Sequence, residues 1–138
     1  HNIRFTFIPK NFQNAKKHNV LTWLIDASET HPASGFENHL WNGITDEVAA
    51  KLLSSIINNK SLLSDLPTTL HLFSRKAISK FELAELILNR YLLPMNNVVK
   101  INAQNSKNLT LSSSHFVYQL QLWATLGFNT IPNFEDLF

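Results

Sequence analysis

A short apolar run followed by a strongly marked helix start limits the folds open to this chain. Leu70–Ser74 has the composition of a buried strand. Ser79–Glu82 has the spacing of a capping box, in which the Ser and Glu side chains each bond to the other residue's backbone N–H. Ile78 and Leu83 are placed to form the accompanying hydrophobic staple. The helix then continues until Pro94, which ends it.

The same alternation of strand and helix patterns continues along the chain. Thr45 can cap a second helix, and Asp46 and Glu47 are placed favourably at the positive N-terminal end of that helix. Strands are also expected around Ile3–Ile8 and Val98–Ile101, and helices at Val20–Ile25 and Phe116–Leu126, the last one stopped by Gly127. Loops are expected at residues 31–35, 35–45, 64–67 and 102–114. We therefore predict an α/β fold of mixed short strands with about four helices.

The composition predicts one globular domain over residues 1–138. Hydrophobic residues make up 44% of the chain and charged residues 16%, which argues against disorder. Twelve Lys and Arg against ten Asp and Glu leave a charge of +2 and no basic block, so we expect no nucleic-acid binding. The apolar runs are shorter than the ~20 residues of a membrane span, so no membrane partner is expected. The absence of cysteine excludes disulfides and fits a cytoplasmic protein.

The sequence lacks the motifs of a self-sufficient enzyme. Its three glycines are too far apart for a GxGxxG or GxxxxGK[ST] phosphate-binding loop. Neither tyrosine has a lysine four residues later, and neither GxSxG nor HExxH occurs. No two of the six histidines are four residues apart. We therefore expect no catalytic residue, no metal site and no cofactor bound by this chain.

The stretch Gly35–Thr45 is the best candidate for ligand recognition. Asn38, His39 and Asn42 can both donate and accept hydrogen bonds, and Trp41 adds an indole face beside them. Such a set suits a neutral polyhydroxylated ligand such as a sugar. The alternative interpretation is structural: the Asn residues order a turn-rich loop and Trp41 fills the core.

Four stretches resemble one family of enzymes. Ile3–Pro9 is similar to the pattern (I/L)R-x-(S/T)-x-I-G, and Gly35–Thr45 to GF-x-N-H-x-W-N-G-x-T. Leu70–Leu83 is similar to YH-(L/V)-x-S followed by (I/V)SKYEL, and Asn108–Phe116 to D-R-S-L-x-S-x-R-F. In this order they resemble the C-terminal part of extended short-chain dehydrogenases/reductases that act on nucleotide sugars, of the dTDP-4-dehydrorhamnose reductase-like kind.

This resemblance implies the substrate-binding lobe and the last strands of a Rossmann-type reductase in bacterial polysaccharide biosynthesis. In that family NAD(P) and the catalytic Tyr and Lys belong to the N-terminal half, which would lie upstream of His1. The chain would then be an inactive fragment, whose partner is a nucleotide-sugar substrate. The first residue is not Met, which we also interpret as the mark of a fragment.

Further substrate contacts are expected from polar residues near the same motifs. Leu109 stands where the family pattern has an Arg suited to a diphosphate, and Lys107 nearby offers only a point charge. Thr110 can meet phosphate oxygens or can simply belong to a connecting loop. Arg4 can contact ligand or form a structural ion pair, and Lys10 follows the first strand, where α/β ligands bind, or is merely solvated.

Two other functions remain open. One is a non-catalytic binding or interaction module with the same architecture, and the other is a small α/β hydrolase whose site is assembled by the fold. If the chain is a fragment, the strands at Ile3–Ile8 and Leu70–Ser74 would be cut from a larger parallel sheet that is normally covered on both faces, and they would expose edges and apolar faces. We therefore expect the isolated chain to form a homo-oligomer.

Overall fold

The computed structural model describes residues 2–8, 20–27 and 29–138, and its contacts divide the chain into two compact units. Unit 1 comprises His1–Lys10, Asn42–Lys76 and Leu111–Phe138. Unit 2 comprises Asn11–Trp41 and Ala77–Thr110. The single domain over residues 1–138 stays a prediction, and each unit is described by itself.

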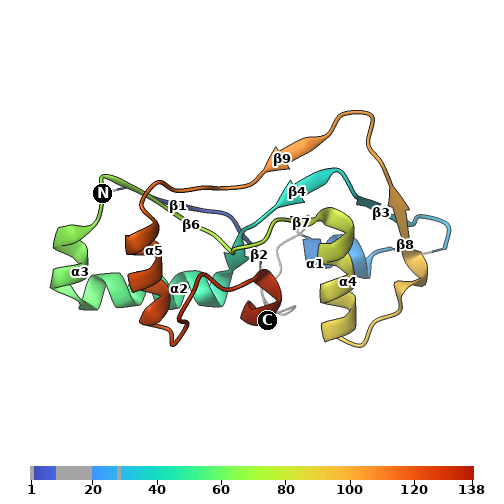
Figure 1. Cartoon of the computed structure of the whole chain (residues 1–138). Helices are drawn as coiled ribbons and strands as arrows, with labels where there is room; N and C mark the ends of the chain where they lie inside the picture. Colours follow the sequence, from blue (N-terminus) through green and yellow to red (C-terminus); the bar gives the residue numbers. More distant parts are fainter. Residues whose placement is uncertain (1, 9–19, 28) are drawn as a thin grey trace. The chain divides into compact units, whose positions relative to one another are not determined.

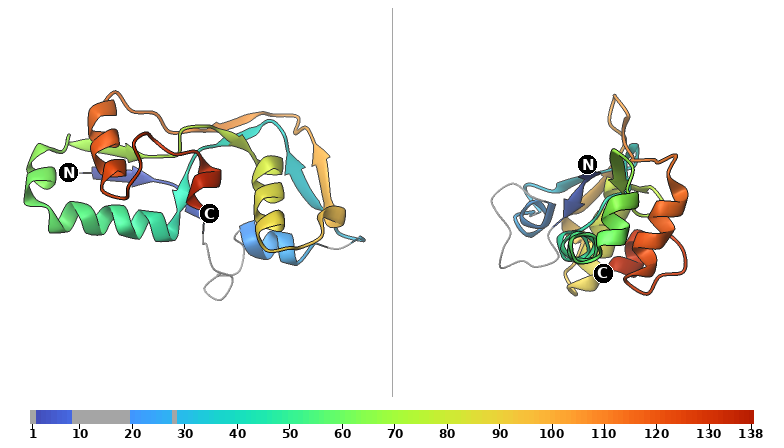
Figure 2. Two further views of the ribbon diagram at one scale, coloured as in Figure 1. Left: turned by 60° about the horizontal axis from the view of Figure 1, so that its bottom comes forward. Right: turned by 90° about the vertical axis from the view of Figure 1, so that its left-hand side faces the viewer.

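Unit 1 is built on two short pairs of parallel strands. Strand β1 (Asn2–Phe5) pairs with β6 (Thr69–Leu72), and β2 (Phe7–Ile8) pairs with β5 (Ile44–Thr45). Helix α2 (Asp46–Asn58) packs against α5 (Phe116–Ala124) beside the β1–β6 pair, as Figures 1 and 2 show. The unit also contains α3 (Lys60–Asp65) and a 3₁₀ helix, η3 (Phe134–Leu137).

The core of unit 1 follows from the alternation along β6. Leu70 and Leu72 are buried, whereas Thr69 and His71, which alternate with them, are only half-buried, the period-2 pattern of a strand with one face inward. The largest side chains that join this core with almost no exposure are Ile44, Leu52, Ile56, Leu122, Trp123 and Phe134. Burial of such residues is the main stabilising contribution to a unit of this size.

Unit 2 contains a parallel pair and a three-stranded mixed sheet. Strand β3 (Ala33–Phe36) pairs in parallel with β8 (Val98–Ile101). Strand β4 (His39–Trp41) is central in the other sheet, antiparallel to β7 (Ile78–Ser79) and parallel to β9 (Lys107–Leu109). Helices α1 (Val20–Ile25) and α4 (Lys80–Arg90) lie together near β3, and η2 (Met95–Asn97) precedes β8 (Figure 1).

The local helix signals are confirmed. The backbone N–H of Val48 donates to Thr45 Oγ1 at 3.3 Å, so Thr45 caps α2 as expected. Ser79 and Glu82 form the reciprocal capping box of α4, with N–O distances of 2.7 and 3.1 Å. The α/β class with mixed short strands is likewise confirmed, although the described residues contain five α-helices and not four.

Four of the predicted loops are wrong in part. Residues 31–35 and 35–45 contain β3, β4 and β5, and residues 102–114 contain β9. Helix α3 takes in Ser64 and Asp65 at the start of the predicted turn, after Asn59 caps it by accepting from Leu62 N at 3.2 Å. The missed strands have two to four residues each and depend on partners far away in sequence, so no local pattern announced them.

Two helices end in the same hydrogen-bonded motif, but with different residues at its special position. After α5, Gly127 N donates to Ala124 O and Phe128 N to Trp123 O, the Schellman pattern, with Gly127 at φ +88°. After α4, Leu92 N donates to Asn89 O and Leu93 N to Leu88 O, the same pattern. Here, however, Leu92 holds the left-handed conformation at φ +54°. Leucine is disfavoured in that region, since its Cβ crowds the backbone.

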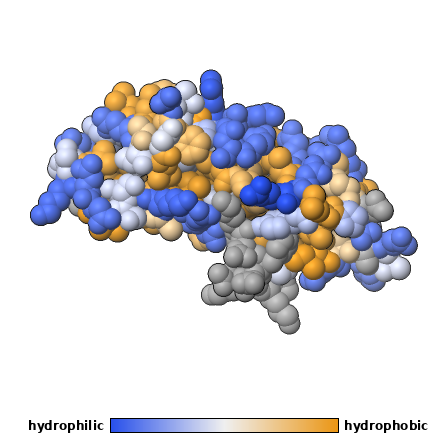
Figure 3. All heavy atoms as spheres, turned by 90° about the horizontal axis from the view of Figure 1, so that it is seen from below, coloured by the Kyte–Doolittle hydropathy of each residue, from blue (hydrophilic) through white to orange (hydrophobic). Residues whose placement is uncertain are grey.

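Apolar side chains also reach the surface of both units. On the face drawn in Figure 3, apolar residues form separate areas between hydrophilic ones. Among the residues that the structure describes, the large apolar ones that are exposed are Phe7, Ile57, Phe116 and Val117 in unit 1, and Ile25, Leu92, Val99 and Leu109 in unit 2. Among the described helices, none combines the length and the hydropathy that crossing a membrane requires.

Candidate functional site

The two asparagines predicted to recognise a ligand bond to backbone. Asn38 Nδ2 donates to Ala103 O at 2.8 Å, and Ala103 N donates to Asn38 Oδ1 at 3.0 Å. In unit 1, Asn42 makes the same reciprocal pair with Leu111, at 2.8 and 2.7 Å. Each side-chain amide therefore makes the pair of backbone hydrogen bonds that a neighbouring strand would otherwise make. Its partner lies a few residues before or after β9 in the sequence. An amide has two N–H donors and two acceptor lone pairs, so these bonds use half of the hydrogen-bonding capacity of each side chain.

His39 and Trp41 are held by the strand that they share. The His39 ring packs on Phe36, with centroids 4.5 Å apart, and its Nε2 lies 3.2 Å from Asn105 O, a geometry that fits an Nε2–H donor. Trp41 is half-buried in β4, in register with Ile78 and Leu109 on either side. The interpretation in which these residues order the chain therefore accounts for most of their contacts.

The remaining predicted contacts are distributed over both units. Lys107 is exposed in β9, in register with His39. The Thr110 hydroxyl and backbone N–H both donate to Asn108 Oδ1, at 2.6 and 3.0 Å, a local turn that occupies the hydroxyl hydrogen. Arg4 is exposed in β1 of unit 1, in register with His71, and Lys10 lies outside the described residues. A common ligand-binding wall for the whole set stays a prediction.

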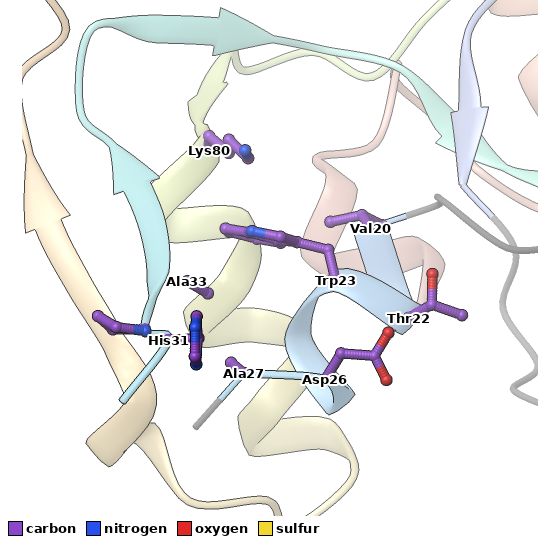
Figure 4. Close-up of a pocket in the computed structure, with 9 residues that line it drawn as sticks. Val20, Thr22, Trp23, Asp26, Ala27, His31, Ala33 and Lys80 are labelled. Carbon is purple, nitrogen blue, oxygen red and sulfur yellow. The ribbon is translucent and has the colours of Figure 1, made fainter. Parts of the chain in front are cut away.

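Unit 2 contains a cavity between α1, β3 and the start of α4 that the sequence analysis does not predict. Its volume is about 590 Å³, within the range of small-molecule sites. The residues that line it are Val20, Thr22, Trp23, Asp26, Ala27, His31, Pro32, Ala33 and Lys80. In Figure 4, Trp23 points from α1 toward β3 and α4, while Thr22 and Asp26 point to the other side of α1.

A lysine and a tryptophan dominate this cavity. Lys80 Nζ lies 4.0 Å from the centroid of the Trp23 ring and 5.2 Å from that of Phe36, so the ammonium stacks on aromatic faces. Burial lowers the pKa of the Lys80 amine below its ordinary value of 10.5, because the charged form loses hydration. Within the part of the chain that the structure describes, no carboxylate forms an ion pair with Lys80.

Trp23 and Lys80 were missed because each has a convincing structural role in the sequence. Trp23 belongs to the apolar cluster of a short helix, and Lys80 is the residue after the cap of α4. Their proximity depends on how α1 and α4 pack, which a local pattern does not reveal. Among the described residues, no group of three His, Cys, Asp or Glu side chains is placed to hold a metal ion.

Comparison with known proteins gives a match in fold. No protein-family model matches the chain, and no curated protein matches it in sequence. Solved structures that resemble it include the dTDP-4-dehydrorhamnose reductase of Bacillus anthracis in complex with NADP, with a TM-score of 0.64 and 17% identity. A dTDP-4-dehydrorhamnose reductase ortholog from Clostridium acetobutylicum gives a TM-score of 0.55 and 14% identity.

The match covers most of this chain but less than half of each reductase. It covers 94% of this chain but 42% of the Bacillus anthracis protein, and 88% against 42% for the Clostridium acetobutylicum protein. The chain thus spans less than half the length of these reductases. The resemblance expected from the sequence is confirmed at the level of architecture: over most of its length, this chain has the fold of part of a dTDP-4-dehydrorhamnose reductase.

Proposed function

We propose that this chain forms the nucleotide-sugar-binding part of an NAD(P)-dependent sugar-nucleotide reductase or epimerase. The observation that carries the proposal is the fold match to two dTDP-4-dehydrorhamnose reductases, which takes in nearly all of this chain and less than half of theirs. One of these reductases is in complex with NADP. The sequence motifs around Gly35–Thr45 and Ser79–Leu83 independently point to the same family.

In this proposal the chain binds the sugar nucleotide, and a separate cofactor-binding half carries out hydride and proton transfer. The chain has no GxGxxG loop and no Tyr-x-x-x-Lys pair, so hydride and proton transfer would need groups outside it. Its own residues would orient the sugar nucleotide. His39, Trp41 and Lys107 lie on adjacent strands of one sheet, and Asn38 immediately precedes β4, which makes this sheet a suitable recognition surface.

Titration of the chain with dTDP-glucose and UDP-glucose tests the proposal. We expect saturable binding of at least one, competed by the matching nucleoside diphosphate, and weakened about tenfold by His39→Ala or Lys107→Met. Glu47→Gln, on the exposed side of α2 in unit 1, serves as the control and should leave affinity unchanged. A folded chain that binds neither sugar nucleotide at millimolar concentration would contradict the proposal.

A non-catalytic interaction module is the second candidate, and one observation favours it. Asn38 and Asn42 already make two backbone hydrogen bonds each, so their amides are explained without any ligand. The gene sequence upstream of Ile3 separates the two candidates. A GxxGxxG loop and a Tyr-x-x-x-Lys pair in frame would support the reductase, and a start codon just before Asn2 would support the module.

A further inference from the structure

The cavity between α1, β3 and α4 is formed by residues other than those expected to bind a nucleotide sugar. It combines a planar aromatic face, apolar walls from Val20 and Ala33, and one ammonium group. A core packing defect would be apolar and small, whereas this cavity is about 590 Å³ and has Lys80 and His31 among its lining. Cavities with a few polar groups set in apolar walls are the usual form of a small-molecule site.

The charge of Lys80 has aromatic neighbours but no counter-charge among the described residues. Its Nζ lies over Trp23 and near Phe36, and the nearest acidic residue of its own helix, Glu82, is engaged in the capping box through Ser79. Asp26 lines the cavity but points to the other side of α1 (Figure 4). A half-buried ammonium without a carboxylate gains more from an incoming anion than a hydrated one does.

Lys100, in the same unit, differs from Lys80 in having a carboxylate partner. Lys100 Nζ also lies near an aromatic ring, 5.1 Å from the centroid of Phe81, but it is exposed and bonded to Glu37 at 2.7 Å. Lys100 is therefore already neutralised, and Lys80 is not. Of these two lysines, Lys80 is the one equipped to receive an anionic group.

We propose that the cavity between α1, β3 and α4 binds a ring-bearing phosphate ester, with the ring against Trp23 and the phosphate on Lys80 Nζ. A lysine ammonium can bind phosphate as a point charge, and no arginine is among the residues that line the cavity. The indole supplies the stacking surface, and Val20 and Ala33 close the apolar side. His31, whose Nδ1 lies 3.0 Å from Thr30 Oγ1, belongs to the same lining. The inference goes beyond the proposed function and holds whichever of the two candidate functions is correct.

Phenyl phosphate tests the inference, because it contains the ring and the phosphate and no nucleotide or sugar. Its two fragments, phenol and inorganic phosphate, are the ligand controls. The readout is the indole N–H resonance of each tryptophan, assigned through Trp23→Phe. The completely buried Trp123 serves as the internal reference. We expect phenyl phosphate to shift the Trp23 signal saturably and to bind about tenfold or more tightly than either fragment.

Two lysine variants separate a built site from general charge attraction. Lys80→Met keeps the aliphatic stem and should weaken phenyl phosphate about tenfold or more, while Lys80→Arg should restore most of the affinity. Lys100→Met, the matched control, should leave it unchanged. Equal losses in Lys80→Met and Lys100→Met, or saturable binding that leaves the Trp23 signal unmoved, would overturn the inference. Dispersion of the amide spectrum shows that each variant is folded, and Lys80→Arg remains informative if Lys80→Met is not.

The outcomes also distinguish this inference from the proposed function. Sugar-nucleotide binding that depends on His39 and Lys107, together with no binding of phenyl phosphate, would leave the proposed function standing and reject the cavity site. Phenyl phosphate binding that depends on Lys80, without any sugar-nucleotide binding, would do the reverse.

Discussion

Gly35 in β3 lies directly against Phe81 in α4. A Cβ atom on Gly35 would stand 2.6 Å from Phe81 Cδ2 and 3.2 Å from Phe81 Cα, so the strand and the helix approach more closely than any side chain at position 35 allows. The approach brings the start of α4, with Lys80, near the cavity wall that β3 provides. Gly35 is thus required by packing, not by a turn.

Gly35→Ala should lower the free energy of unfolding by about 1–3 kcal/mol, because the new methyl group must displace Phe81. Chemical denaturation of the variant and the wild type measures the difference. Adding Phe81→Ala to Gly35→Ala should recover part of the loss relative to Phe81→Ala alone, since alanine has no Cδ2 atom to meet the new methyl group. A fully neutral Gly35→Ala would show that β3 and α4 are farther apart than the structure places them.

The two Schellman ends predict opposite effects for exchanges at the left-handed position. Leu92→Gly should raise the free energy of unfolding by about 0.5–1 kcal/mol, because it relieves the strain of φ +54° and the leucine side chain, 92% exposed, packs on little. Gly127→Ala should lower it by about 1 kcal/mol, since φ +88° is unfavourable for alanine even though nothing lies within 4 Å of the new Cβ. Thermal melts of the two variants, compared with the wild type, test both signs together. A loss in Leu92→Gly would mean that leucine makes contacts that its exposure hides.

Asn42 should matter to stability more than its polarity suggests. Asn42 is 5% exposed, and Asn42→Ala removes both of its hydrogen bonds to the backbone of Leu111, so the variant should lower the free energy of unfolding by about 2–3 kcal/mol. Asn42→Asp keeps the acceptor and loses the donor, so its stability should lie between those of the wild type and Asn42→Ala. Chemical denaturation gives the ranking. If Asn42→Ala were neutral in stability but abolished sugar-nucleotide binding, the amide would be a ligand contact and not a backbone clamp.

Lys80 should lose its proton at a lower pH than Lys100. Burial lowers the pKa of Lys80 below 10.5, whereas the side-chain hydrogen bond to Glu37, then its charge, raises the pKa of Lys100 above 10.5. Heteronuclear NMR that follows the side-chain signals of the two lysines measures both midpoints. Identical midpoints would mean that Lys80 is as well hydrated as a surface lysine.

The pKa shifts also set the direction of a stability change with pH. In the window just below pH 10.5 the folded chain releases the Lys80 proton before the unfolded chain does, so the contribution of Lys80 to the free energy of unfolding rises with pH. The contribution of Lys100 is present below pH 10.5 and is lost as the pH rises through its raised folded pKa. The free energy of unfolding of the wild type should therefore rise relative to that of Lys80→Met as the pH approaches 10.5, because only the wild type has the Lys80 amine to release. Chemical denaturation of both proteins at several pH values measures the difference, and a difference that does not change with pH would contradict the prediction.

Strand β1 provides a test of self-association. It pairs with β6 on one edge, and the described residues provide no strand for its other edge. Phe7, just beyond it, is 52% exposed. Open edges and apolar side chains favour pairing between chains, so sedimentation velocity should show a concentration-dependent dimer or larger species. Phe7→Lys should shift it toward monomer, and Ile57→Lys, at an exposed site on α2, is the control. A monomer at all concentrations would contradict the prediction.

The sequence alone determined four of the five α-helices of the described residues and several of their ends, because those signals are local. The Thr45 cap, the Ser79–Glu82 capping box and the Gly127 end each depend on residues within one or two turns of each other. The spacing of residue types in the sequence was therefore enough to predict them. Strands with a clear alternation or an apolar run were found as well. The family resemblance, carried by short motifs, also anticipated the fold that the reductase structures share with this chain.

Only the tertiary structure decided the rest. Strands β3, β4 and β9 exist because of partners far away in sequence, and their few residues include Gly35 and polar side chains that read as loop. The reciprocal bonds of Asn38 to Ala103, and the stacking of Lys80 on Trp23, likewise join segments that meet only when the chain is folded. A residue type shows which bonds a side chain can make. Which of them it makes depends on what the fold places within a few ångströms.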